Sequence, residues 1–269
     1  MKPATPILFL CAAAAFGQVP PKQDAVVTLA NTPTAQTVKQ MTTILRTVAD
    51  VPEVSFDEAH SSFTLRGQAN QLGLAEWLLR AMDKPAGWQS STQEAADPSS
   101  REYHSQKGGY PIEDRSPVAR IYYLTNTTSK LGMQEILTVA RAVGEIQQMA
   151  ECDSPRLIVF RGTATIVDLG EWITRKLDVP AGGGAFALQN QNPGANLLKL
   201  PGTSDGTEDI VRVLYLDPAM SQKGIGDLSR KIRATLAIRT IFWKTSPPAI
   251  VVRGSSALLA QAQQIVNSQ

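Results

Sequence analysis

A unit of about 60 residues occurs three times in this 269-residue chain, and no other feature restricts the possible folds as strongly. Each copy contains an early apolar segment that ends in Leu and a later apolar segment that ends in Arg-Gly. The Leu and the Arg are 37 residues apart in every copy, at Leu29 and Arg66, Leu124 and Arg161, and Leu216 and Arg253. Three equal spacings without a gap indicate one structural unit that is used three times.

The apolar pattern inside the unit predicts the order strand, helix, strand, strand, helix. After the first strand, apolar residues recur at helical spacing, as at Val38, Met41 and Leu45. Because two amphipathic helices must each bury one face, we expect an α+β fold with two helices on one face of a three-stranded sheet. These βαββα modules are predicted at residues 24–85 (module 1), 117–180 (module 2) and 210–269 (module 3).

The segments between the modules, residues 86–116 and 181–209, are rich in Ser, Gln, Pro and Gly. A coil of about 30 residues spans roughly 30 Å, so these linkers are predicted to be too long for a solenoid in which each repeat touches the next. The alternative is that they form ordered hairpins or loops, since residues 186–188 and 197–200 are apolar enough for that.

The first 17 residues have the pattern of a cleaved secretory signal peptide. Lys2 supplies a positive start, a short apolar stretch follows, and small residues precede a cut before Gln18. Two alternatives are a buried N-terminal element and lipid attachment at Cys11, whose surroundings loosely resemble a bacterial lipobox. The expected location is therefore the periplasm or cell envelope.

The sequence offers little material for catalysis, for a metal site or for a cofactor. After cleavage Cys152 would be the only cysteine, so no intrachain disulfide is expected. His60 and His104 lie in polar segments without a metal-ligand spacing, and no serine lies in a Gly-x-Ser-x-Gly motif. We therefore expect no catalytic, cofactor-binding or metal-binding residues.

The overall charge argues against a nucleic-acid-binding protein. The 26 basic and 24 acidic residues leave a net charge of only +2. A KH-like mix of helices and strands occurs in nucleic-acid-binding modules, but the Gly-x-x-Gly loop that these need between two helices is missing. A basic run in module 3, from Lys223 to Arg239, is explained by a solvated helix face or by an anionic partner such as a lipid headgroup or an acidic protein.

The motifs of the unit resemble the periplasmic N-domains of bacterial secretins (secretin N-terminal or NolW-like modules). Those domains carry strands of the form Val-x-Leu-x-Tyr-Leu and Leu-Ile-Val-x-Gly, and a helix ending in Leu-Asp-x-Pro. The matching residues here are 213–216, 157–162 and 177–180, and the resemblance covers all three copies. It implies the βαββα fold, packing into rings and docking of envelope partners or cargo, with no catalytic residues. We expect modules without the C-terminal membrane barrel of a full secretin.

The closing helices of modules 1 and 2 carry large apolar residues away from their predicted core face. Leu74 and Trp77 fall there in module 1, and Leu169 and Trp172 in module 2. The hypothesis is that these four residues contact a neighbouring module, a linker or a partner, whereas module 3, with Gln261 and Gln264, is a polar end. The alternative is that each Trp lies at the rim of its own core.

Together these features predict a non-enzymatic envelope protein that works by protein–protein assembly. It would be part of, or accessory to, a secretion or pilus system and would associate with itself or with other envelope proteins. The rival class is a periplasmic ligand-binding protein or enzyme that uses a cleft between modules, which a deep pocket with convergent polar groups would favour.

Overall fold

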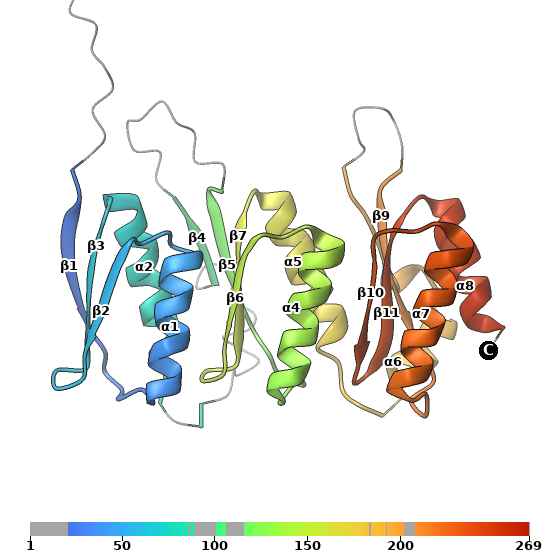
Figure 1. The fold of residues 1–269 in the computed structure, drawn as a ribbon, viewed down its shortest axis with the longest axis horizontal. Coiled ribbons are helices and arrows are strands. Elements are labelled where there is room, and N and C mark those ends of the chain that lie inside the picture. Colours follow the sequence, from blue (N-terminus) through green and yellow to red (C-terminus); the bar gives the residue numbers. More distant parts are fainter. Residues whose placement is uncertain are drawn as a thin grey trace, which may run out of the picture.

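The computed structural model describes residues 21–85, 87–88, 101–105, 116–182, 184–191, 193–201 and 208–268. Within these ranges the chain is α+β, with three antiparallel sheets that follow one another along its longest axis (Figure 1). The predicted signal peptide and parts of both predicted linkers lie outside the described residues.

The predicted βαββα order is confirmed in all three copies. Module 1 has β1 (Gln23–Thr28), α1 (Ala35–Thr47), β2 (Glu53–Asp57), β3 (Ser62–Gly67) and α2 (Ala69–Met82). Module 2 has β5 (Val118–Tyr123), α4 (Lys130–Gly144), β6 (Gln148–Cys152), β7 (Leu157–Gly162) and α5 (Ala164–Leu177). Module 3 has β9 (Ile210–Tyr215), α7 (Gln222–Leu236), β10 (Ile241–Thr245), β11 (Pro248–Gly254) and α8 (Ser256–Asn267).

Local sequence sets where the first helix of each module begins. A hydroxyl oxygen at the N-cap accepts a hydrogen bond from the backbone N–H three residues later, which satisfies one of the free donors of the first turn. The three caps are Thr34 at 3.1 Å from the nitrogen of Thr37, Ser129 at 3.1 Å from that of Gly132, and Ser221 at 3.2 Å from that of Gly224.

The Leu-Asp-x-Pro motif closes its module by hydrogen bonds. The Asp178 carboxylate accepts from the backbone nitrogens of Thr125, Asn126 and Thr127 at 2.6–2.9 Å. Asp83 does the same in module 1, where it accepts from the backbone nitrogens after β1 at 2.6 and 3.0 Å. The aspartate therefore joins the end of the last helix to the loop that follows the first strand.

The sheets of modules 2 and 3 have four strands, so the prediction of three-stranded sheets is wrong there. The strand orders are β1-β3-β2, β4-β5-β7-β6 and β8-β9-β11-β10. The extra strands, β4 (Glu102–His104) and β8 (Leu197–Lys199), come from the predicted linkers, and the second linker also holds α6 (Gly184–Gln191) and the 3₁₀ turn η1 (Pro193–Asn196). Parts of both predicted linkers therefore form regular secondary structure.

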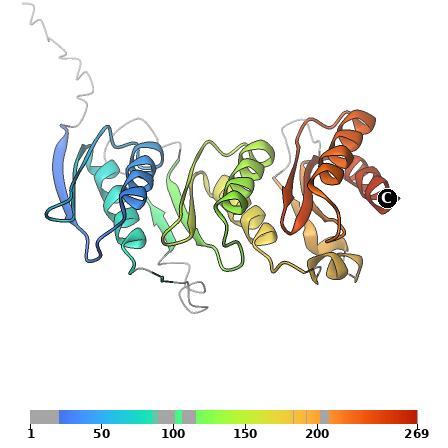
Figure 2. The same ribbon diagram turned by 60° about the horizontal axis from the view of Figure 1, so that its bottom comes forward.

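The three modules pack directly on one another, so the expectation that the linkers keep them apart is also wrong. The helices of one module cover the outer face of the next sheet, as the two views in Figures 1 and 2 show. One core cluster contains residues of α1 and α2 together with Ile121, Tyr123, Leu157 and Val159 of module 2. A second cluster contains residues of α4 and α5 together with Val213 and other residues of module 3.

The physical reason for the stacking is that the sheets of modules 2 and 3 are apolar on both faces. In β7, all six residues are buried, whereas β1 alternates between exposed and half-buried residues. A strand that is buried along its whole length needs cover on both sides, and only the preceding module can supply the second cover. We call the two contacts joint 1–2 and joint 2–3.

We predict that a charge placed inside a joint destabilises the stack of modules. Val139 is fully buried and lies on α4 four residues after Glu135, which bonds to β10, so it faces joint 2–3. Val139→Lys should lower the free energy of unfolding by about 3 kcal/mol or more, because an unpaired ammonium would be buried. Urea titration followed by circular dichroism measures the change.

The control is Thr138→Lys, one residue earlier on the same helix, where the side chain is exposed. This variant should change stability by no more than about 0.5 kcal/mol. Equal effects of the two substitutions would contradict the placement of Val139 in a joint.

Candidate protein–protein interface

Cysteine and histidine, which often serve in metal and catalytic sites, are represented among the described residues by Cys152, His60 and His104. No group of three or more His, Cys, Asp and Glu side chains among them is arranged to hold a metal ion. Cys152 is buried, and burial raises the pKa of its thiol to about 12, so the thiolate is not available at neutral pH. His60 is exposed and pairs with Asp57 at 2.7 Å, and His104 pairs with Glu102 at 2.6 Å.

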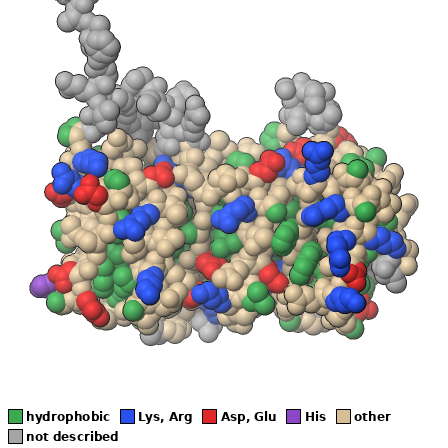
Figure 3. Space-filling view, viewed as in Figure 1, with side chains coloured by type: hydrophobic (Ala, Val, Ile, Leu, Met, Phe, Trp, Pro, Cys, Tyr) green, Lys and Arg blue, Asp and Glu red, His purple; other side chains and the backbone are tan. Residues whose placement is uncertain are grey.

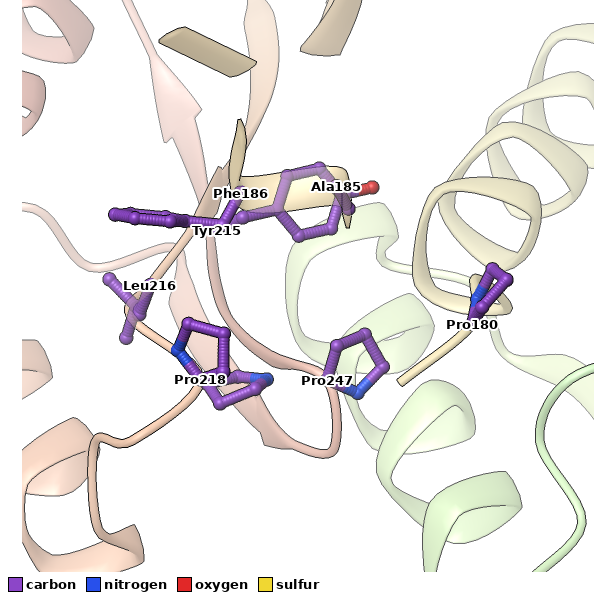
Figure 4. Close-up of a pocket in the computed structure, with 8 residues that line it drawn as sticks. Pro180, Ala185, Phe186, Tyr215, Leu216, Pro218 and Pro247 are labelled. Atoms are coloured by element: carbon purple, nitrogen blue, oxygen red, sulfur yellow. The ribbon is translucent and has the colours of Figure 1, made fainter. Parts of the chain in front are cut away.

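A depression between modules 2 and 3 is lined by apolar side chains. Figure 4 shows prolines at its lower rim and the rings of Phe186 and Tyr215 above them. The hydroxyl of Tyr215 already donates to the carbonyl of Lys176 at 2.5 Å. The lining is Pro180, Ala185, Phe186, Tyr215, Leu216, Pro218, Pro247 and Pro248. This depression lacks the convergent polar groups that a ligand site or an active site would need.

The recurring arginine of the repeat makes a bridge across joint 1–2. Arg161 is only 8% exposed, and one of its terminal nitrogens donates to the carbonyl oxygen of Val48 at 2.7 Å and to Asp50 at 2.8 Å. Its Nε donates to the carbonyl of Ser116 at 3.0 Å. The guanidinium therefore covers free carbonyls at the C-terminal end of α1 and pairs with a carboxylate there.

The same bridge is built at joint 2–3 from equivalent residues. Arg253 donates to the carbonyl of Val143 at 3.1 Å and contacts Glu145 at 3.4 Å, at the end of α4. Its other nitrogens bind Asp209 at 2.6 and 2.8 Å. These bonds to Asp209 come first among the causes that raise the pKa of Arg253, so its charge is secure at every physiological pH.

A tyrosine makes the second repeated contact, at the other helix of each joint. The hydroxyl of Tyr123 donates to the carbonyl of Ala81 at 3.1 Å, as that of Tyr215 does to Lys176. Both acceptors lie near the end of the closing helix of the preceding module. In module 1 the equivalent position holds Thr28, which is exposed.

A third contact repeats between the first helix and the strand turn of the next module. The backbone nitrogen of Asp153 donates to the side-chain oxygen of Gln40 at 3.1 Å. In joint 2–3, Glu135 accepts from the backbone nitrogen of Thr245 at 3.2 Å and from its hydroxyl at 2.5 Å. Three contacts at matching positions therefore set the same register in both joints.

The four residues predicted as a contact surface belong to the two core clusters that extend across the joints. Leu74 and Leu169 are each 2% exposed. Trp77 is half-buried, and its ring lies 5.8 Å from that of Tyr103 on β4. Trp172 is half-buried in the cluster that includes the sheet of module 3. Contact of these residues with a separate protein stays a prediction.

A network of charges binds β4 to the closing helix of module 2. Arg120 binds Glu102, Asp168 at 2.8 Å and Glu171 at 2.7 Å. Burial opposes the charge of Arg120, but these three carboxylates outweigh that effect and raise its pKa. In module 3 no carboxylate of the described residues pairs with the equivalent Arg212, and burial lowers its pKa.

Lys244 is buried in joint 2–3 without a hydrogen-bond partner among the described residues. Its exposed fraction is zero. Desolvation lowers its pKa, although Glu135 and Asp178 act in the opposite direction. A buried, unpaired ammonium destabilises the folded state, so joint 2–3 contains a built-in weakness.

Sequence reasoning found part of these contacts. It singled out the recurring arginines, but it could not show that their partners lie in another module. It missed Tyr123 and Tyr215, although aromatic residues in two equivalent strand positions, against Thr28 in the first copy, are a signal. No helix among the described residues is long and apolar enough to cross a membrane.

No family model matches the chain, and no curated protein matches its sequence. The solved structures that match include secretins, the family that the sequence motifs resemble. A dimeric mutant of the N-terminal domain of the secretin XcpQ from Pseudomonas aeruginosa is 11% identical, with a TM-score of 0.23 over 59% of this chain and 63% of that one.

Two further matches are to longer secretin chains. ExeD of Aeromonas hydrophila is 14% identical, with a TM-score of 0.20 over 92% of this chain and 41% of that one. A chain of the ETEC pilotin–secretin AspS–GspD complex is 13% identical, with a TM-score of 0.18 over 91% and 37%. This chain therefore spans less than half the length of both.

We predict that removing the arginine of joint 1–2 destabilises the protein. Arg161→Ala should lower the free energy of unfolding by about 3 kcal/mol, because it leaves the carbonyl of Val48 without its donor and Asp50 without its ion-pair partner. Arg66→Ala is the matched control. It removes the equivalent residue of module 1, which is 55% exposed, and should change stability by no more than about 0.5 kcal/mol.

We also predict that Lys244→Met stabilises the protein at neutral pH, by about 1–3 kcal/mol. Because the pKa of Lys244 is lower in the folded than in the unfolded protein, its penalty is full below the folded pKa and disappears as pH rises toward the unfolded value. The gain should therefore shrink in urea titrations carried out at increasingly alkaline pH. A gain that is independent of pH, or one that the exposed Lys223→Met also gives, would contradict this account.

Proposed function

We propose that this chain is an exported envelope protein whose three stacked modules form a scaffold for protein–protein assembly. It would be part of, or accessory to, a secretion or pilus system. The observation that carries the proposal is the joint, which is built twice with the same arginine, tyrosine and turn contacts. A repeated joint gives one elongated body that presents equivalent surfaces at regular intervals, which suits a structural part.

Sheet edges supply surfaces for such assembly. In the described part of the chain, β2, β6 and β10 are each paired on one side only, so each module offers a strand edge along the same side of the stack. An unpaired edge can accept a strand of another protein or be covered by a neighbouring domain. The sequence resemblance to secretin N-domains, which pack side by side, supports this mode.

The rival function, ligand binding or catalysis in a cleft between modules, has less support. The joints are filled by two core clusters. The depression at joint 2–3 is apolar, and the buried thiol of Cys152 is not a nucleophile at neutral pH. Assembly is therefore the function that the geometry supports best.

Export is tested by the N-terminus of the protein after expression in a bacterial host. We expect recovery in the envelope fraction with Gln18 as the first residue, and retention of uncleaved chain in the cytoplasm for Leu10→Arg, which interrupts the apolar stretch. Pro21→Arg, beyond the stretch, is the control. An intact mass that shows a lipid on Cys11 would replace the cleavage prediction, and a cytoplasmic wild-type chain would contradict the proposal.

Assembly is tested by cross-linking in cells, followed by mass measurement of the purified products. We expect the chain in defined complexes well above monomer mass, with secretion-system or pilus components at fixed stoichiometry. A chain that stays monomeric in the envelope and cross-links to no fixed set of proteins would contradict the assembly proposal.

A further inference from the structure

The two ends of the stack differ strongly in charge. Module 1 has five basic and seven acidic residues, a net charge of −2, and module 2 has seven of each. Module 3 has eight basic residues and only Asp217 and Asp227 as acids, a net charge of +6. Figure 3 shows Lys and Arg side chains gathered over module 3 on the side of α7. The near-neutral total therefore conceals a separation of charge along the molecule.

The outer sheet face of module 1 corresponds, position by position, to the faces buried in the two joints, but it is polar. Its exposed residues include three carboxylates at positions where modules 2 and 3 have none, and these pair with the neighbouring side chains of Arg66, Lys22 and His60. These are Asp24, where the others have Ala119 and Val211, Glu53, where they have Gln148 and Thr240, and Asp57, where they have Cys152 and Lys244.

The outer helix face of module 3 has basic and polar residues at positions where the helices of the internal joints have apolar ones. Lys231 is exposed at the position that Ile44 and Val139 occupy, fully buried, in the two joints. Gln261 and Gln264 replace the large apolar residues of the closing helices. A sheet that covers this face would thus meet a cation and two amides where the internal joints have hydrocarbon.

Two features of a joint are nevertheless kept on the outer sheet face of module 1. Arg66 occupies the place of the bridging residues Arg161 and Arg253, and its side chain is 55% exposed beside Asp24. Val26 occupies the place of the core residues Ile121 and Val213, and the residue is 67% exposed. This face therefore keeps an arginine and an apolar centre suited to a helix pair.

We propose that the partner of each end is a second copy of this chain. The outer sheet face of module 1 in one copy docks on α7 and α8 of module 3 in another, in the register of the internal joints. The inference rests on the proposed assembly function and names one partner for it. The opposite net charges of modules 1 and 3 and continuity with two established joints select this occupant over an unrelated protein or a lipid surface.

The register assigns specific contacts to this joint. Arg66 reaches the carbonyl of Thr235, as Arg161 reaches Val48. In joint 2–3 the Nζ of Lys244 lies beside Gly132, in the first turn of α4. The Nζ is 4.0 Å from the position that a Cβ atom on Gly132 would occupy. The equivalent Asp57 would lie at the first turn of α7, where the helix dipole and Lys223 favour a carboxylate.

Because charges replace apolar residues, this joint is weaker than the internal ones and sensitive to salt. A head-to-tail contact generates open chains or rings rather than closed dimers. We therefore expect the average mass of the full chain to rise with protein concentration at 50 mM salt and to return to that of the monomer at 500 mM. Sedimentation velocity measures both.

Substitutions on α7 separate a specific contact from general attraction between charges. Lys231→Glu should weaken the association at least fivefold, and Lys231→Val, which restores the residue type of the internal joints, should strengthen it. Arg230→Glu is the control with the same change of charge, since its equivalents Thr43 and Thr138 are exposed in joined modules. Equal weakening by Lys231→Glu and Arg230→Glu would overturn the proposed register.

A disulfide tests the register directly in the full chain carrying Cys11→Ser. In the internal joints Glu135 bonds to Thr245, and the equivalent pair between copies is Asp227 and Glu58, two carboxylates whose repulsion the cysteine substitutions also remove. Mixing Asp227→Cys with Glu58→Cys protein should give a disulfide-linked dimer under mild oxidation, whereas Arg230→Cys with Glu58→Cys should give little.

A monomer at every concentration in low salt, or no selective disulfide, overturns the inference. If that monomer still cross-links to envelope components in cells, the proposed function stands and only its partner is wrong. A third outcome is that copies do not associate but the wild-type chain binds vesicles of anionic lipid. If Arg230→Glu then reduces the binding to vesicles, the basic end serves a membrane surface instead.

Discussion

The burial of each apolar sheet on both faces is the constraint on which the rest of the structure depends. A unit of about 60 residues makes a small core and is marginally stable alone. In modules 2 and 3 the second sheet face adds Ile121, Val159 and Val213, among others, to a core shared with the preceding helices. Stability and shape therefore arise together, since the contact that completes each core also fixes the direction of the stack.

Polar contacts then specify the register of an interface whose driving force is hydrophobic. The arginine and tyrosine bridges each satisfy backbone carbonyls at helix ends, which would otherwise be buried without donors. Asp50 and Glu145 follow the first helices of modules 1 and 2 at equivalent positions. Asp50 pairs with Arg161, and Glu145 pairs with Arg253. Because the bridges recur at matching positions, both joints have the same geometry, and equivalent surfaces follow at equal steps along the sides.

The sequence predicted the unit better than its assembly. Helical and strand periodicity, the Arg-Gly turns and the Leu-Asp-x-Pro ends were sufficient for the βαββα order, because local patterning determines it. The fourth strands were missed because β4 and β8 have three residues each, and a segment of that length has no readable period. Linker length alone does not predict the stacking. The wholly apolar strand at residues 157–160 is the better signal, because it requires cover on both faces.

The central claim, that the three modules form one body, is tested most directly by a distance distribution between its ends. Spin labels on Thr43→Cys and Arg230→Cys, in a chain with Cys11→Ser and with Cys152 buried, report the separation of α1 and α7 by pulsed electron resonance. The account predicts a single narrow distribution at the distance that the stack defines, unchanged by moderate salt. A broad distribution, as three modules on flexible linkers would give, would contradict it.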